Sequence, residues 1–238
     1  MDAIKIYQEC ELGNLEPIKK FIEANQNDLN SKISVSMMPI FAVKGNSLNI
    51  IEYLYDTLPN SKELYDSHNI KLLIQATCFQ KKTKIFKYII NKFNTNEILD
   101  SALDNCVMHN NPETLKYLFD RFPDNKKFDE KLQYLIRLAS TKGNLDIIEY
   151  IFNDEQIRKK AEQYLKDETF LSVAYNNKHM NVVNYFLFDL KIEETPKLKN
   201  YIKSIPELKK MFETRDNYFS LQDDLDKNEP NTSKKLKL

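Results

Sequence analysis

A segment of five residues recurs along the chain with nearly constant spacing. Two apolar residues, one polar residue, a tyrosine and a further apolar residue follow one another, as in IIEYL at 50–54 and IIEYI at 147–151. Apolar residues at these offsets lie on one face of an α-helix. The tyrosines of five such segments, one of which has Thr114 in place of its first apolar residue, are Tyr53, Tyr88, Tyr117, Tyr150 and Tyr185, at spacings of 35, 29, 33 and 35 residues. A period of about 33 residues predicts an array of similar helical units, each packed on its neighbours.

The first unit departs from this pattern in one position. Its segment is PIKKF at 17–21, which has Lys20 where the later units have tyrosine. A polar residue suits a terminal unit, because one side of that unit faces water. In the other units the periodicity predicts that the tyrosine rings lie in the core with their hydroxyls at its edge, rather than stacking on nucleic-acid bases.

A second, shorter apolar segment precedes each tyrosine segment and ends near a small residue. We call this the small-residue position, nine residues before the second apolar residue of the tyrosine segment. It holds Ala42, Cys106, Ala139 and Ala174, while unit three offers Ala76 or Thr77 and unit one has Glu9. Because a small side chain lets two helices approach closely, each unit is predicted to be a first helix, a turn and a second helix.

The chain has three glycines, Gly13, Gly45 and Gly143, and all of them fall between a first and a second helix. This placement predicts a left-handed residue that closes the first helix. The asparagines that follow, Asn14, Asn46 and Asn144, are expected to cap the second helix. In unit four, which lacks the glycine, Asn111 is the expected N-cap and Pro112 the first helical residue.

These features together resemble ankyrin repeats. The segment ASTKGNLDIIEYIF at 139–152 is similar to the inner sequence of that family, and MPIF at 38–41 is faintly similar to its T-P-L-H opening. The resemblance covers about residues 3–190. It implies an all-α, ankyrin-like solenoid of about six helix-turn-helix repeats. The chain departs from the family in its linkers, because no glycine lies between units and no Gly-Ala-Asp type hairpin is found there.

The remaining sequence suggests three regions. Residues 1–193 are expected to form the repeat array, in which the linker at 153–168 reads as an extra short helix. Residues 194–215 are expected to form C-terminal capping helices, because the basic segment at 196–213 has amphipathic spacing. Residues 216–238 are polar, acidic and then basic, and are expected to be a disordered tail.

Composition limits the classes of function. The 35 basic and 35 acidic residues balance, so no overall field attracts nucleic acid or an anionic membrane. No secretory signal precedes the array, and no stretch is apolar enough to span a membrane. Three scattered cysteines, Cys10, Cys78 and Cys106, are expected to be reduced and buried, which favours a cytoplasmic location.

No motif for catalysis is present. Phosphate-binding loops need clustered glycines, whereas each glycine here stands alone, and HExxH, CxxC and GxSxG motifs are missing. The three histidines, His68, His109 and His179, are expected in separate turns or at a helix start, too far apart to share a metal. We therefore expect no catalytic residues, no cofactor and no metal, and do not expect an enzyme.

The resemblance implies a monomeric, non-catalytic scaffold that binds a protein or peptide partner through its concave face. A cellular regulator and an effector of an intracellular microbe or virus, acting in the host cytoplasm, both fit. The alternative is a nucleic-acid or nucleotide-binding module that uses the same groove, which would need a contiguous positive patch. The interspersed charges favour a protein partner.

Candidate binding residues follow from the small-residue position. In ankyrin-like units the residue before it, and those two and three after it, point to the concave side. These residues are Phe41, Lys44, Gln75, Phe79, Asn105, Met108, His109, Leu138, Thr141, Lys142, Val173, Asn176 and Asn177. An apolar strip with a polar rim suits a protein or peptide partner. The other interpretation of Phe41 and Leu138 is that they belong to the core.

Overall fold

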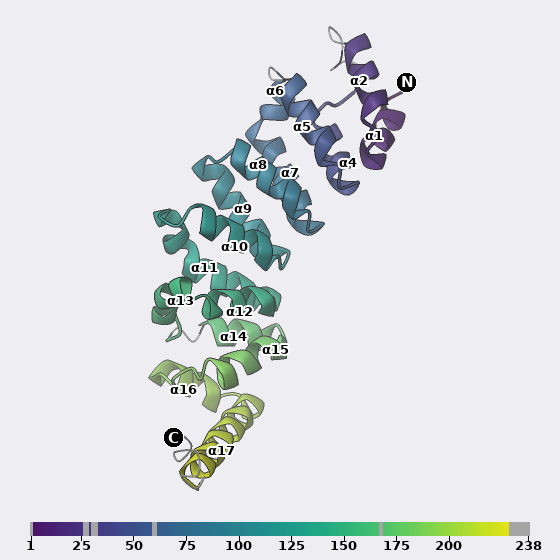
Figure 1. Cartoon of the computed structure of the whole chain (residues 1–238). Coiled ribbons are helices and arrows are strands. Elements are labelled where there is room, and N and C mark those ends of the chain that lie inside the picture. The colour runs from purple at the N-terminus through teal and green to yellow at the C-terminus, as the bar shows by residue number, and fades with distance from the viewer. Residues whose placement is uncertain (1, 26–28, 30–32, 59–60, 167–168, 229–238) are drawn as a thin grey trace, which may run out of the picture.

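The computed structural model describes residues 2–25, 29, 33–58, 61–166 and 169–228. These residues form helices and their connections, and no strand occurs among them. The chain is therefore all-α, as predicted. Figure 1 shows the helices following one another in a curved, elongated array, with α1 and α17 at opposite ends of the array.

Six helices, which we call the first helices, form one layer. They are α1 (Ala3–Leu12), α4 (Met37–Lys44), α7 (Ser67–Phe79), α9 (Asn96–Met108), α11 (Lys126–Lys142) and α14 (Thr169–Asn176). Each first helix packs against the first helix of the next unit along the chain. The small-residue positions Ala42, Thr77, Cys106, Ala139 and Ala174 are fully buried, as close helix packing requires.

The second helices form the other layer. They are α2 (Leu15–Ala24), α5 (Leu48–Thr57), α8 (Thr83–Lys92), α10 (Pro112–Arg121), α12 (Leu145–Asn153) and α15 (Met180–Asn184), which continues into the π-helical turn η2 (Tyr185–Asp189). Each one contacts the first helix of its own unit, and from α5 onward each contacts the next second helix. The apolar pairs of the recurrent segments, such as Ile50 and Ile51, are buried between the two layers.

Short helices occupy two of the linkers between units. These are α6 (Lys62–Tyr65) and α13 (Glu155–Ala161), the latter followed by the 3-10 turn η1 (Glu162–Tyr164). The helix expected in the linker at 153–168 is therefore present. Asp154 caps α13, because its carboxylate accepts hydrogen bonds from the backbone N–H groups of Gln156 and Ile157, both at 3.1 Å.

All six turns between first and second helices share one backbone geometry. The carbonyl oxygen at the small-residue position accepts a hydrogen bond from the backbone N–H five residues later, at 2.8–3.0 Å in every unit. The donors are Asn14, Ser47, Lys82, Asn111, Asn144 and His179. In unit three the acceptor is Thr77, which decides between the two candidates for that position. This long bond satisfies a carbonyl that the helix end would otherwise leave without a partner.

A left-handed residue lies just before each of these donors. It is Gly13 (φ 80°), Asn46 (59°), Lys81 (54°), Asn110 (47°), Gly143 (73°) and Lys178 (63°) in units one to six. The prediction is confirmed for Gly13 and Gly143, but it is wrong for Gly45, which has a right-handed φ of −78°. Asparagine tolerates the left-handed region, so Asn46 takes that role and Gly45 stands one residue earlier.

The capping predictions are confirmed in part. The Asn111 side chain accepts a hydrogen bond from the Thr114 backbone N–H at 3.3 Å, and Pro112 begins α10. Asn14 and Asn144 precede their helices but their side chains do not cap them. The prediction for Asn46 is wrong, because the shifted turn makes Ser47 the residue before α5.

Several turns also reach back to the preceding unit. The Asn144 side chain donates a hydrogen bond to the Val107 carbonyl, and Nε2 of His179 lies 3.0 Å from the Thr141 carbonyl oxygen. In unit two, Gly45 lies against the Glu11 backbone at the end of α1. Each of these contacts joins the turn of one unit to the end of the previous first helix.

The recurrent tyrosines are half-buried and pack against the core, so the prediction that their rings, including that of Tyr117, lie in the core is confirmed in part. Their rings lie where the second helices of neighbouring units meet. The Tyr117 hydroxyl donates to Oδ1 of Asn91 at 2.7 Å, and Nζ of Lys87 lies 5.2 Å from its ring centre. The neighbouring Leu118 is fully buried.

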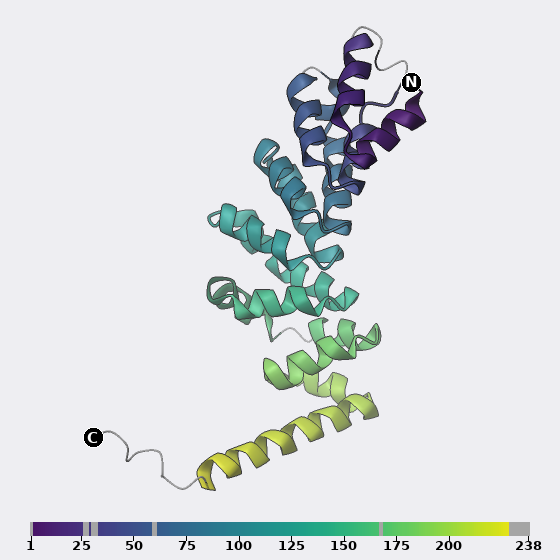
Figure 2. The ribbon, with the colours of Figure 1, turned by 45° about the vertical axis from the view of Figure 1, so that its right-hand side comes forward.

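The C-terminal part of the array ends in α16 (Pro196–Lys203) and the long helix α17 (Pro206–Asn228), which Figure 2 shows extending away from the other helices. The prediction of a disordered tail from residue 216 is therefore wrong for residues 216–228, which are helical. Residues 229–238 lie outside the described residues. The buried Arg215 fixes α17, because its guanidinium donates to Glu194 and to the Ile192 carbonyl, both at 3.2 Å. The Phe219 ring lies under Nζ of Lys191 at 4.2 Å.

Candidate protein-binding face

The thirteen residues predicted to face a partner all lie on the first helices or at the turns that follow them. None is buried. Exposed are Lys44, Gln75, Phe79, Met108, Lys142, Asn176 and Asn177, and half-buried are Phe41, Asn105, His109, Leu138, Thr141 and Val173. Phe41 and Leu138 pack against the core with part of their surface. Phe41 also stacks on Tyr7 at 5.0 Å between ring centres.

The structure brings together the aromatic and apolar candidates of units three and four. Phe79 ends α7 and is 69% exposed, and Met108 ends α9 and is 44% exposed. The Phe79 ring meets the His109 ring edge to face, with 5.4 Å between their centres. These three residues form an apolar cluster across two neighbouring units.

The surroundings of His109 disfavour its charged form. Burial and, to a smaller extent, the nearby positive charge of Lys142 lower the pKa of His109 below its ordinary value. Its Nε2 atom is buried and has no hydrogen-bond partner in the described part of the chain. A neutral imidazole beside Phe79 extends the apolar character of the cluster.

The candidates of unit six are already engaged within the chain. Oδ1 of Asn176 accepts a hydrogen bond from the Tyr201 hydroxyl of α16 at 2.9 Å. Nδ2 of Asn177 donates to the Val173 carbonyl at 2.7 Å. Asn176 and Asn177 are therefore less available to a partner than the cluster at Phe79.

The sequence interpretation missed a row of positions on the same helices whose large members are exposed, whereas Ser101 and Thr169 in that row are half-buried. This row lies five residues before the small-residue position and holds Ile4, Met37, Leu72, Ser101, Tyr134 and Thr169. Its four large members are 70%, 40%, 42% and 39% exposed, in the order Ile4, Met37, Leu72, Tyr134. The signal was present in the sequence, since apolar residues recur there in units one, two, three and five.

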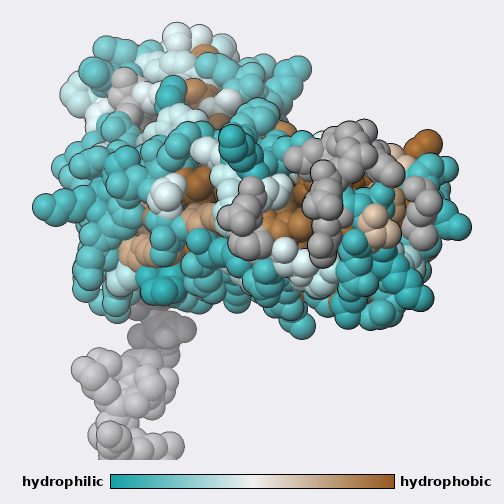
Figure 3. Space-filling view, turned by 90° about the horizontal axis from the view of Figure 1, so that it is seen from above, coloured by the Kyte–Doolittle hydropathy of each residue, from teal (hydrophilic) through white to brown (hydrophobic). Residues whose placement is uncertain are grey.

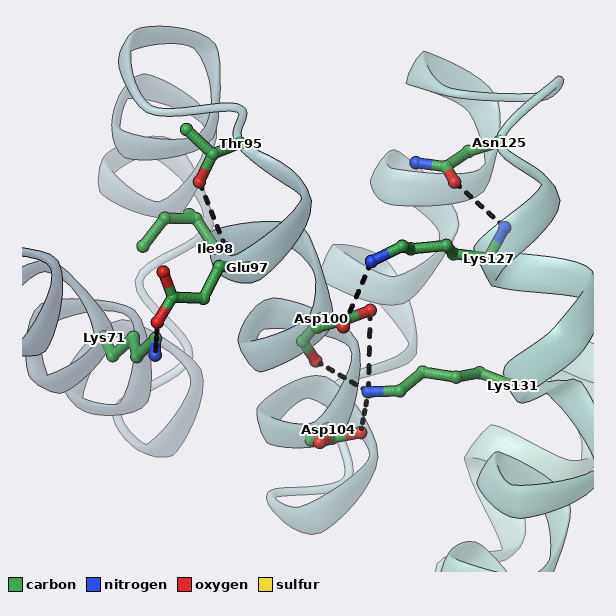
Figure 4. Close-up of polar contacts among 9 residues, drawn as sticks. All are labelled: Lys71, Thr95, Glu97, Ile98, Asp100, Asp104, Asn125, Lys127 and Lys131. Atoms are coloured by element: carbon green, nitrogen blue, oxygen red, sulfur yellow. Dashed lines mark hydrogen bonds and ion pairs between the residues drawn. The ribbon is translucent and has the colours of Figure 1, made fainter.

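Charged residues of the first helices are paired with one another across neighbouring units. Lys44 contacts Glu11 at 2.8 Å, and Lys71 contacts Glu97. Figure 4 shows Lys131 between Asp100 and Asp104, at 3.7 and 3.1 Å, with Lys127 beside Asp100 at 3.9 Å. These pairs neutralise part of the charge that the first helices carry.

The possible metal ligands of the described residues are dispersed. No group of three or more histidine, cysteine, aspartate or glutamate side chains among them is arranged to hold a metal ion. The three cysteines are buried and unbridged. Burial raises the pKa of Cys10 to about 12, and Sγ of Cys78 lies 3.9 Å from Sγ of Cys106. Buried thiols with raised pKa values are poor nucleophiles.

No helix in the described ranges is both long enough and apolar enough to cross a membrane. Figure 3, which looks onto the N-terminal end of the array, shows hydrophobic side chains in a few patches within a largely hydrophilic surface.

Comparison with curated proteins finds one distant similarity. The chain is 27% identical over 127 residues to L774 of Acanthamoeba polyphaga mimivirus, a protein whose name assigns it provisionally to the ankyrin repeat proteins. The aligned region is 53% of this chain and 17% of the relative, so the chain spans less than a fifth of that protein's length. No family model and no solved structure matches the chain.

Proposed function

We propose that the chain is a divergent ankyrin-like solenoid of about six repeats that binds a protein or peptide partner and carries out no catalysis. The array occupies residues 1–193, and the helices that follow from residue 194 cap its last unit. Support comes from the shared turn geometry of all six helix pairs and from the distant ankyrin repeat relative.

The observation that carries this proposal is the cluster at Phe79, Met108 and His109. It combines the exposed apolar surface of Phe79 and Met108 with the positive charge of Lys142 near His109, as in the centre and edge of a protein interface. A nucleic acid would have to compete with the ion pairs of the first helices, and this argues against the alternative function.

The partner is a protein in the cytoplasm, and the chain acts there as a monomer. The chain is either a regulator within its own cell or an effector in the cytoplasm of a host. The viral source of the relative keeps the second setting open.

The test compares two variants of the full chain as baits in a lysate of the source organism, with mass spectrometry of the captured proteins. Phe79→Ala combined with Met108→Ala is the test variant. Leu221→Ala is the control, because Leu221 is an exposed apolar residue on α17, which lies far from the cluster. Proteins captured by the wild type and the control but lost by the double variant support the proposal. Capture that depends on nucleic acid, or that is equal for all baits, contradicts it.

A further inference from the structure

Two of the three cysteines meet at the interface between units three and four. Cys78 lies on α7, one residue after the small-residue position of unit three, and Cys106 holds the small-residue position of unit four on α9. Helices α7 and α9 pack against each other, and both cysteines are fully buried between them. Their Sγ atoms are 3.9 Å apart, although the two residues are 28 positions apart in the chain. The fold therefore brings two free thiols into contact across neighbouring units.

The two sulfur atoms are near enough to be joined. The sulfur atoms of a disulfide are about 2.05 Å apart, so the Sγ atoms of Cys78 and Cys106 have to approach each other by about 1.9 Å. Rotation about the side-chain bonds of the two cysteines and a small shift of α7 toward α9 provide this movement. A disulfide here would close a loop that contains the second helix of unit three, α8, and the linker after it.

The pair lies directly inside the candidate binding cluster. Cys78 immediately precedes Phe79 near the end of α7, and Cys106 lies two residues before Met108 near the end of α9. The cysteines face the core, whereas Phe79 and Met108 are exposed. A bond between the cysteines would therefore fix the two helix ends that carry the cluster relative to each other.

We propose that Cys78 and Cys106 form a redox-sensitive staple, a disulfide that a peroxide produces and that holds unit three to unit four beneath the cluster. Hydrogen peroxide first oxidises one thiol to a sulfenic acid and releases one water molecule. The sulfur of the other thiol then attacks the sulfenic sulfur, the S–S bond forms, and the second water molecule leaves. Two thiols are oxidised and one peroxide is reduced, and an added thiol reverses the reaction by exchange. The staple does not depend on the proposed function or on any partner.

The closed array protects the pair from rapid oxidation. A hydrogen bond between the two thiols, together with burial, raises the pKa of Cys78 well above its ordinary value, so little of the reactive thiolate is present. In a linear array each unit contacts mainly its neighbours, so one interface can open while the others stay packed. Oxidation therefore proceeds when units three and four separate, and the bond that forms prevents them from separating again.

The third cysteine provides a matched control. Cys10 is fully buried and holds in unit one the position that Cys78 holds in unit three. The small-residue position of unit two, however, is Ala42 and not a cysteine. Replacing Cys106 by alanine removes one partner of the pair and suits the fold, because alanine holds the same position in three other units.

The experiment treats the full chain with hydrogen peroxide and counts the remaining thiols by maleimide labelling in denaturant and mass spectrometry. The wild type should lose two of its three thiols and give a bridged pair of peptides that contain Cys78 and Cys106, and dithiothreitol should restore both thiols. Cys106→Ala should keep its two remaining thiols under the same treatment. Cys10→Ala should lose both of its thiols to the bridge.

Urea unfolding measures whether the bond holds the interface. The bridge restricts the unfolded chain by closing the loop between the two cysteines, so the oxidised wild type should unfold at a higher urea concentration than the reduced protein. Treated and untreated Cys106→Ala should unfold at the same concentration. A wild type that retains all three thiols, a bridge that includes Cys10, or an equal loss of thiols in Cys106→Ala would overturn the staple. A bridge that lowers the urea midpoint would also overturn it, because the bond would then strain the interface.

Discussion

The carbonyl oxygen of Glu11 occupies the space that a side chain on Gly45 would need. A Cβ atom on Gly45 would lie 1.8 Å from that oxygen and 2.6 Å from the carbonyl carbon. Gly45 has an ordinary right-handed φ of −78°, so the backbone conformation does not require glycine. The close approach of unit two to the end of α1 requires it instead.

Gly45→Ala should therefore destabilise the protein by about 1–3 kcal/mol, because backbone must move to relieve the contact. Asn46→Gly is the matched control, since Asn46 is left-handed and glycine adopts that region without strain. Chemical denaturation of both variants measures the free energies of unfolding. A Gly45→Ala variant as stable as the wild type would show that the two units are not this close.

Lys178→Gly should stabilise the protein by about 0.5–1 kcal/mol, because Lys178 has a φ of 63° and glycine removes the steric cost of that conformation. Lys178→Ala keeps a Cβ atom and should change stability little. Gly143→Val, at the equivalent position of unit five, should destabilise by more than about 1 kcal/mol. Thermal melts rank the three variants, and the reverse order would contradict the shared turn geometry.

Leu118→Ala should cost about 2–5 kcal/mol, because Leu118 is fully buried in a central unit. Phe21→Ala in the first unit should cost less, since a terminal unit has a neighbour on one side only. Urea titrations of the two variants give the comparison. Equal losses would argue against a linear array.

Phe219→Ala should destabilise the protein by about 1–2 kcal/mol, because its half-buried ring contacts Phe188 and lies under Lys191. Leu221→Ala, two residues further along α17, should have little effect, because Leu221 is exposed. Differential scanning fluorimetry distinguishes them. If neither change lowers the melting temperature, residues 216–228 do not stabilise the array.

Acid should weaken the protein in part through His109. Its pKa is lowered in the folded state, so the unfolded chain binds the proton more readily once the pH falls below about 6.5. Stability is therefore lost as the pH falls from that value through the folded pKa. His109→Gln should lose less stability than the wild type between about pH 7 and pH 5. His68→Gln, at an exposed position, should behave as the wild type, and identical profiles for all three proteins would contradict the assignment.

Much of the fold could be predicted from the sequence, because the repeated pattern of apolar and small residues reflects local packing. The tyrosine segments predicted the second helices, and the small residues predicted where the two layers of helices pack closely. The register of the turn in unit two was not accessible, because asparagine and lysine also adopt the left-handed conformation and glycine was assumed to mark it. Helix α17 was missed because Arg215 and Phe219 contact residues more than twenty positions earlier in the chain, and its composition alone is polar.

The position of the candidate site could be predicted from the sequence, but its extent could not. Counting from the small-residue position correctly kept Phe79 and Met108 out of the core. The row at Ile4, Met37 and Leu72 was missed. These residues lie nearer the N-terminal end of each first helix, and their exposure there depends on how adjacent first helices are offset. The use of Phe79 and Met108 by a partner stays a prediction.

The turn contacts of Gly45, Asn144 and His179 point the same way along the chain, and this has a consequence for biosynthesis. Asn144 and His179 bond to carbonyls that lie about 37 residues earlier, and Gly45 meets Glu11 in the same sense. A growing chain therefore already contains the acceptor when each new turn leaves the ribosome. A fragment that stops after any second helix keeps these contacts for every unit it holds, whereas a fragment that lacks its N-terminal units leaves such a turn without its acceptor. The array can be completed unit by unit in the order of translation.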